Sequence, residues 1–149
     1  RPLAKGWRNM DRKILVVDDE AVIREWLADA FTTQGYKPYV AENGQEAMQI
    51  LNREDIYVIV LDLKLFGMNG IELCRKIRQR RPLAIVYAMT GWGALFEVEE
   101  CREAGFDDYF IKPMDTDMIL RAIADAFAKI ERWRGKSLFP GNPPMEEVR

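Results

Sequence analysis

Short apolar runs alternate along this chain with segments of helical periodicity, and this alternation constrains the fold more than any other feature. Residues 56–61 contain no charged side chain, which is typical of a strand buried on both faces of a parallel sheet. Between the runs, apolar residues recur three and four positions apart, as one face of a helix requires. Five predicted strands and five predicted helices in strict alternation indicate an α/β fold with a doubly wound parallel sheet.

The predicted strands cover residues 13–17, 36–41, 56–61, 83–89 and about 107–111. The helices follow them: one closed by Gly35, then 45–53, about 71–80, 94–104, and a last one that starts at 115–117. Pro38 has no amide hydrogen, so the second strand is expected at an edge of the sheet. Two helices have especially regular apolar faces, the first with Val22, Ile23, Trp26, Leu27, Ala30 and Phe31, the last with Met118, Ile119, Ala122, Ile123, Ala126, Phe127 and Ile130.

Polar side chains stand where four of these strands end. Asp62 directly follows the third run, and Asp18 and Asp19 follow the first; Thr90 follows the fourth run and Lys112 the fifth. Parallel strands present their carboxyl ends at one edge, where open α/β sheets form their ligand crevice, so these side chains are expected to converge. Carboxylates, a hydroxyl and an amine together suit a divalent metal beside an aspartate that accepts a phosphoryl group.

Composition excludes several classes of function. A formal net charge of −2 and a pI near 5.3 give no general attraction to nucleic acid or to an anionic membrane. No apolar stretch approaches the roughly 20 residues of a spanning helix. The chain has no histidine, which rules out a Ser-His-Asp triad or a histidine phosphocarrier and makes a structural zinc site improbable. Cys74 and Cys101 fall in helical patterns and are expected as buried thiols, so a reducing cytoplasm is the default location.

The length of 149 residues fits one domain, which we place at residues 12–134. Residues 1–11 are interpreted as an N-terminal extension. Residues 135–149 contain three prolines and are interpreted as a C-terminal tail or linker. Whether the domain acts alone or belongs to a longer chain stays open at this point.

Taken together and in this order, five motifs resemble a response regulator receiver domain, the CheY-like, flavodoxin-like (βα)5 fold. The resemblance runs from about Arg12 to Arg132 and rests on Ile14-Leu15-Val16-Val17-Asp18-Asp19-Glu20, Val60-Leu61-Asp62-Leu63, Gly67-Met68-Asn69-Gly70, Thr90-Gly91 and Asp107-Asp108-Tyr109-Phe110-Ile111-Lys112-Pro113.

The resemblance implies a role for each matching position at the acidic end of the sheet. Asp62 resembles the phosphoacceptor. Asp18 and Asp19 resemble the acidic pair that holds Mg²⁺, with Asp19 the more direct ligand, and Asp62 would share the ion. Lys64 would offer its backbone carbonyl to the same metal.

The resemblance also implies a switch. Thr90 resembles the hydroxyl that binds the phosphoryl group, Lys112 the amine that pairs with it, and Tyr109 the aromatic residue that moves with Thr90. The Lys112–Pro113 bond is often cis in this family. The surface that changes is made by the fourth helix, the fifth strand and the fifth helix.

Two positions depart from the family pattern. Phe66 stands where proline is usual, so the loop after Asp62 is expected to be less rigid. Trp92 lies between two glycines, where the family usually has an ordinary side chain. As a hypothesis, Lys64 and Trp92 modulate the lifetime of the phosphoryl group, and replacing either with alanine should change the dephosphorylation rate.

The function implied is that of a response regulator in two-component signalling. A histidine kinase or phosphotransfer protein would donate a phosphoryl group to Asp62 with Mg²⁺ as cofactor. The chain would then signal to a downstream protein or output domain. It would be a phosphoacceptor with slow self-dephosphorylation rather than a conventional enzyme. A phosphorylation-dependent homodimer is common in the family. No direct contact with nucleic acid or membrane is expected.

Three other interpretations compete with this one. A pseudo-receiver would keep the fold as a protein-docking module without phosphorylation, although the intact set of Asp18, Asp19, Asp62, Thr90 and Lys112 disfavours it. A phosphatase of the haloacid dehalogenase type needs a second aspartate two residues after the nucleophile, where this chain has Lys64. A dinucleotide-binding domain is disfavoured because no Gly-x-Gly-x-x-Gly follows the first strand.

Overall fold

The computed structural model describes residues 12–91 and 98–134, and these contain one sheet of five parallel strands in the order β2-β1-β3-β4-β5. The strands are β1 (Lys13–Val17), β2 (Lys37–Ala41), β3 (Val58–Asp62), β4 (Ile85–Thr90) and β5 (Asp108–Ile111). The helices are α2 (Ala21–Thr33), α3 (Gly44–Arg53), α4 (Gly70–Arg80), α5 (Val98–Ala104) and α6 (Thr116–Arg134).

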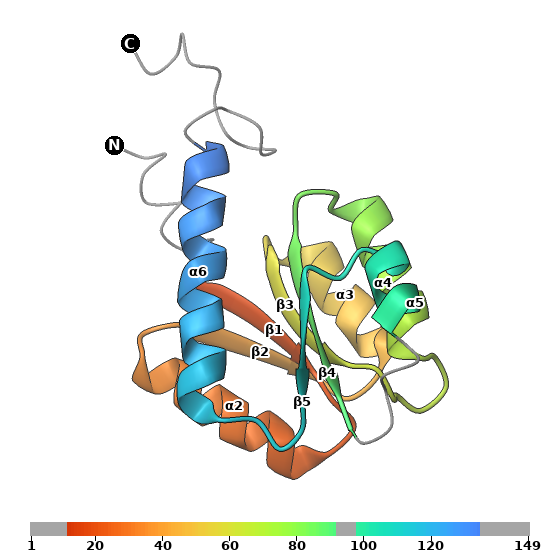
Figure 1. Ribbon diagram of the computed structural model, residues 1–149, viewed down its shortest axis with the longest axis horizontal. Coiled ribbons are helices and arrows are strands. Elements are labelled where there is room, and N and C mark those ends of the chain that lie inside the picture. The colour runs from red at the N-terminus through yellow and green to blue at the C-terminus, as the bar shows by residue number, and fades with distance from the viewer. Residues whose placement is uncertain (1–11, 92–97, 135–149) are drawn as a thin grey trace, which may run out of the picture.

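Helices cover both faces of the sheet, with α2 and α6 on one side and α3, α4 and α5 on the other (Figure 1). Every residue of β3 and β4 is buried between these layers. The predicted doubly wound α/β fold, with five strands and five helices in alternation, is therefore confirmed. Pro38 does lie in an edge strand, β2, as expected.

Strands β3 and β4 start and end later than predicted. We expected β3 to cover 56–61 and β4 to cover 83–89, but pairing continues past Leu61 because the amide of Leu63 donates to the carbonyl of Met89 at 2.9 Å. Asp62 and Thr90 are therefore the last residues of their strands rather than the residues that follow them.

The apolar faces expected from helical spacing are exposed at the start of two helices. Val22 is 67% exposed and Met118 is 48% exposed, although both fit the helical spacing of buried neighbours such as Leu27 and Ile119. Each lies in the first turn of a helix that begins beyond the carboxyl end of a strand, where no sheet lies beneath it.

The loops that flank the helices have clear local causes. Asn43 and Asn69 cap α3 and α4, each accepting a hydrogen bond of 2.8 Å from an amide three residues on. Gly35 and Gly105 adopt φ values of +90° and +106° just after α2 and α5, a region that favours glycine. Cys74 and Cys101 are buried and neither takes part in a disulfide, as predicted. No helix in the described ranges could span a membrane.

Candidate functional site

Strand register brings the polar side chains to one edge of the sheet. Asp62 pairs with Met89 and Thr90 pairs with Ile111. The backbone amide of Lys112 donates to the carbonyl of Thr90 at 2.7 Å, which fixes Lys112 one position beyond β5. The loops that follow β1, β3 and β5 all lie at this edge (lower edge in Figure 1).

Asp18 is wholly buried and has every polar atom engaged. Its Oδ1 accepts from the amide of Glu20 at 2.8 Å, and its Oδ2 accepts from Nζ of Lys112 at 2.8 Å. Its backbone amide donates to Ala41 at 3.0 Å, and its carbonyl accepts from Arg24 Nη1 at 2.8 Å. Asp18 is therefore fixed in position from four directions.

Asp19 behaves differently, because it is exposed and its carboxylate accepts no hydrogen bond from any described residue. One carboxylate oxygen each from Asp18, Asp19 and Asp62 lie within 4.8 Å of one another. Three hard oxygen ligands at this spacing, one of them unpartnered, fit the preference of Mg²⁺ for carboxylates and water. The residues present thus form an acidic pocket that suits a divalent ion.

Asp62 is 5% exposed, and both of its oxygens accept hydrogen bonds. Oδ1 accepts from the amide of Lys64 at 3.1 Å, and Oδ2 accepts from Nζ of Lys112 at 2.9 Å. Burial raises the pKa of Asp62 above its usual value, and the hydrogen bonds from Lys112 and Lys64 offset only part of that effect. The nearby charge of Asp18 raises this pKa further.

Lys112 bridges the two buried carboxylates and also lies 3.5 Å from Oε1 of Glu20. Burial works to lower the pKa of this amine, but the hydrogen bonds to Asp18 and Asp62 outweigh it, so its pKa is raised and it stays protonated. The Lys112–Pro113 peptide is cis. One ammonium thus faces several carboxylates, and the cluster keeps a surplus of negative charge.

The other predicted site residues that the structure describes are Thr90, Tyr109 and Lys64. Thr90 is 2% exposed and its hydroxyl donates to the carbonyl of Gly91 at 3.4 Å; no hydrogen bond joins it to a charged group among residues 12–91 and 98–134. Tyr109 is half-buried on β5 and lines a hollow beside α5. The side chain of Lys64 is exposed, and Trp92 lies outside the described residues.

Two residues of the site were missed from the sequence. Arg24 holds the carbonyl of Asp18, but an arginine in an amphipathic helix looks like any solvated side chain. Gly70 packs so closely that a Cβ would lie 2.4 Å from the carbonyl oxygen of Asp62 and 2.7 Å from Cα of Leu63. The glycine-bearing loop was visible in the sequence, but only the fold shows which glycine meets the strand.

Comparisons with known proteins agree with this arrangement. The family model for the response regulator receiver domain matches residues 14–124. Sporulation initiation phosphotransferase F of Bacillus subtilis is 37% identical over 114 residues, which are 76% of this chain and 92% of that protein. A receiver domain protein from Clostridium thermocellum has a similar structure, with a TM-score of 0.77, 26% identity and coverage of 81% of this chain and 98% of that one.

Other relatives are longer than this chain. Transcriptional regulatory protein ResD of B. subtilis is 37% identical over 139 residues, 93% of this chain, but the match spans only 56% of ResD. For transcriptional regulatory protein GlrR of Escherichia coli, at 32% identity and 81% of this chain, the match spans 28% of that protein. A match across residues 14–124 and a relative covered almost end to end lead to one conclusion: the chain belongs to the response regulator receiver domain family of two-component systems.

Proposed function

We propose that this domain is a working phosphoacceptor in which Asp62 receives a phosphoryl group from a phosphohistidine on a separate kinase or phosphotransfer protein. The observation that carries the proposal is the joint position of Asp62, Asp19 and Lys112: a buried carboxylate, an unpartnered one beside it, and an amine in contact with the first. Asp62 alone would repel a phosphoryl donor, because both carry negative charge. Lys112, and a metal ion held with the help of Asp19, would offset that repulsion.

The transfer balances without any further reactant. An oxygen of Asp62 forms a bond to phosphorus as the phosphorus–nitrogen bond of the donor breaks, and the electron pair returns to the imidazole. Water later attacks the acyl phosphate, releasing inorganic phosphate and restoring the carboxylate. The chain is therefore a phosphoacceptor with slow self-dephosphorylation rather than a metabolic enzyme.

Asp18, Asp19, Asp62 and the backbone carbonyl of Lys64 would hold Mg²⁺. Bound there, the ion would neutralise oxygen charge on both the attacking carboxylate and the phosphoryl group. Lys112 would pair with a phosphoryl oxygen, because its amine already contacts Asp62 at 2.9 Å and is protonated.

The switch would run from Thr90 to the surface of α5, β5 and α6. The hydroxyl of Thr90 has only a long hydrogen bond of 3.4 Å to give up when a phosphoryl oxygen becomes available. Movement of Thr90 would leave space for Tyr109, and both states must differ in affinity for the downstream partner. Lys64 and Trp92 remain predicted modulators of phosphoryl lifetime.

The partners belong to this proposal as well. Receiver domains of response regulators interact with histidine kinases and output domains, and names such as transcriptional regulatory protein ResD show what longer relatives do. For this chain we propose a receiver at residues 12–134, an extension at 1–11, and a tail or linker at 135–149 toward an output domain or a separate protein. A homodimer that forms on phosphorylation fits the same scheme. Contact with nucleic acid is not expected of the receiver itself.

The test is phosphorylation by a small donor. The protein is incubated with acetyl phosphate and Mg²⁺, and intact mass is measured for wild type, Asp62→Asn and a metal-free sample. An adduct that needs both Asp62 and Mg²⁺ supports the proposal. A folded protein that forms no adduct and also fails to bind beryllofluoride would favour a pseudo-receiver, which docks partners without phosphorylation.

A further inference from the structure

We infer that Arg24 is a positioning residue for the metal site, acting through the backbone that carries Asp19. This inference rests on the proposed function, because it concerns the same acidic pocket. Arg24 lies on the first helical turns of α2, and its side chain is 19% exposed. Its guanidinium turns back to the loop between β1 and α2 instead of pointing into solvent.

Arg24 joins two loops that come from neighbouring strands. Nη1 donates to the carbonyl of Asp18 at 2.8 Å, and Nη2 lies 3.7 Å from Oε2 of Glu42, just after β2. The backbone amide of Arg24 donates to the carbonyl of Glu20 at 3.1 Å, so the helix itself holds the base of the side chain. The planar fork of arginine suits such a two-sided link.

The carbonyl that Arg24 binds belongs to the peptide unit shared by Asp18 and Asp19. Asp18 has other anchors, since its carboxylate is held by the amide of Glu20 and by Lys112. Asp19 has none among the described residues, so the orientation of its carboxylate depends on the peptide plane before it. The Arg24 bond fixes that plane. Groups that orient a metal ligand without touching the metal typically change affinity by about 10- to 100-fold when removed.

Charge alone predicts that Arg24→Ala would raise the affinity for a divalent ion, whereas loss of positioning predicts that it would lower it. Removing a cation beside a cluster of carboxylates would strengthen the binding of a divalent ion. Weaker binding after Arg24→Ala can therefore come only from lost positioning. Arg24→Lys keeps the charge and one donor but loses the fork, so it separates the two effects.

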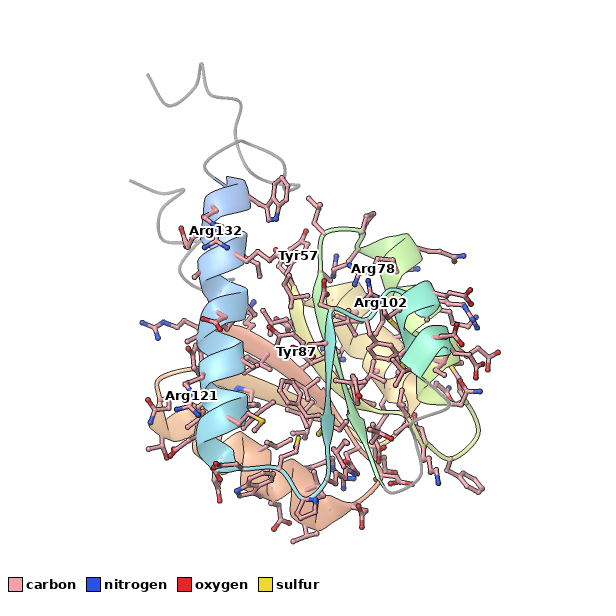
Figure 2. All side chains as sticks on the ribbon, in the orientation of Figure 1. Tyr57, Arg78, Tyr87, Arg102, Arg121 and Arg132 are labelled. Carbon is pink, nitrogen blue, oxygen red and sulfur yellow. The ribbon has the colours of Figure 1, made fainter. Side chains whose placement is uncertain are left out.

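The experiment measures Mn²⁺ binding by the decrease of the free-ion EPR signal, with folding checked by circular dichroism. Wild type, Arg24→Ala, Arg24→Lys and Asp19→Asn are compared. We expect Arg24→Ala to weaken Mn²⁺ binding about tenfold and Arg24→Lys to weaken it less. Arg78→Ala is the matched control, because Arg78 also holds backbone carbonyls, those of Pro82, Ala84 and Gly105, at the opposite edge of the sheet (Figure 2).

The four variants separate a failure of the proposed metal site from a failure of the positioning role of Arg24. Arg78→Ala should lower thermal stability and leave the Mn²⁺ affinity unchanged. If wild type and Asp19→Asn bind Mn²⁺ equally, the proposed metal site itself is wrong. If Asp19→Asn loses binding while both Arg24 variants bind as tightly as wild type or more tightly, the positioning role of Arg24 is overturned. Should Arg24→Ala not fold, Arg24→Lys decides the question alone.

Discussion

Nζ of Lys112 lies 2.9 Å from Oδ2 of Asp62, although the two residues are 50 positions apart and belong to different strands' ends. The same ammonium lies 2.8 Å from Oδ2 of Asp18, so one cation serves two buried carboxylates. Neither carboxylate can leave this arrangement without cost, because an unpaired charge in a buried position is strongly destabilising. Removal of this one cation is therefore expected to destabilise the fold.

Lys112→Met should destabilise the protein by about 3 kcal/mol, because it leaves Asp18 and Asp62 buried without their cation. The free energy of unfolding is measured by urea denaturation in a metal-free buffer. Lys13→Met is the control, since Lys13 has a similarly covered side chain and a single ion pair of 3.1 Å to the partly exposed Glu54. The free energy of unfolding of Lys13→Met should fall by about 1 kcal/mol or less. If Lys112→Met and Lys13→Met lost equal free energies of unfolding, the ion pairs of Lys112 would matter no more for stability than a partly exposed one.

Gly70→Ala should cost about 3 kcal/mol, because the added methyl group would overlap backbone atoms of Asp62 and Leu63 that cannot move aside. Gly91→Ala is the control. A Cβ at Gly91 meets no described atom within 4 Å. The stability of Gly91→Ala should therefore stay within about 0.5 kcal/mol of wild type. Thermal denaturation of both variants checks the difference. A Gly70→Ala protein as stable as wild type would mean that β3 and α4 can separate without loss.

The convergence of Asp18, Asp62 and Lys112 could be predicted from the sequence because one rule sufficed. Residues that follow parallel strands share an edge, and each of these side chains follows an apolar run. The resemblance to receiver domains then proposed a role for each. The strand limits were less certain, since apolarity does not show where pairing stops: the pairing between Leu63 and Met89 extended β3 to Asp62.

Contacts that depend on the path of a loop could not be predicted in this way. Nothing in the spacing of α2 shows that Arg24 binds the carbonyl of Asp18, because that bond depends on how the loop turns after β1. Helical periodicity also put Val22 and Met118 on the apolar faces of their helices, yet periodicity gives only a direction around the helix axis. Whether another layer lies in that direction depends on where the sheet ends.

Tyr87→Phe should cost about 1 kcal/mol at neutral pH, because the buried hydroxyl donates to the carbonyl of Ala122 at 3.0 Å and so ties β4 to α6 (Figure 2). Burial, followed by the charges of Asp107, Asp108 and Asp125, raises the pKa of Tyr87 from 10.0 to about 12. The pKa of Tyr87 is higher in the folded state than in the unfolded state. The protonated hydroxyl therefore contributes its full stabilisation below pH 10, and this stabilisation is lost as the pH rises toward 12.

The stability difference between wild type and Tyr87→Phe should therefore narrow between pH 10 and about 12. Urea denaturation at several pH values in this window measures it. Cys74, whose pKa burial raises from 9.0 to about 12, weakens both proteins alike over that range and cancels in the difference. A difference that stays constant up to pH 12 would contradict the role of the buried hydroxyl.

Phe66→Ala should slow phosphorylation by a protein donor and leave phosphorylation by acetyl phosphate unchanged. Phe66 is 88% exposed and lies four residues after Asp62, on the loop between β3 and α4. We expect a protein that brings phosphohistidine to Asp62 to cover this loop, whereas a small donor need not touch it. Only a minority of interface side chains cost more than about 1 kcal/mol when truncated, and we expect Phe66 to be one of them, with a loss of roughly fivefold or more in binding.

First, a histidine kinase core that phosphorylates the wild-type protein is selected. That core is autophosphorylated with labelled ATP, and the transfer of the labelled phosphoryl group to each variant is then followed. Trp133→Ala is the matched control: Trp133 is 39% exposed, but it lies near the far end of α6, and α6 runs away from the site after β5. We expect that variant to accept phosphoryl groups from both donors at the wild-type rate. If Phe66→Ala slows both donors equally, the loop acts on the chemistry at Asp62 itself. If it slows neither, the donor reaches Asp62 without depending on Phe66.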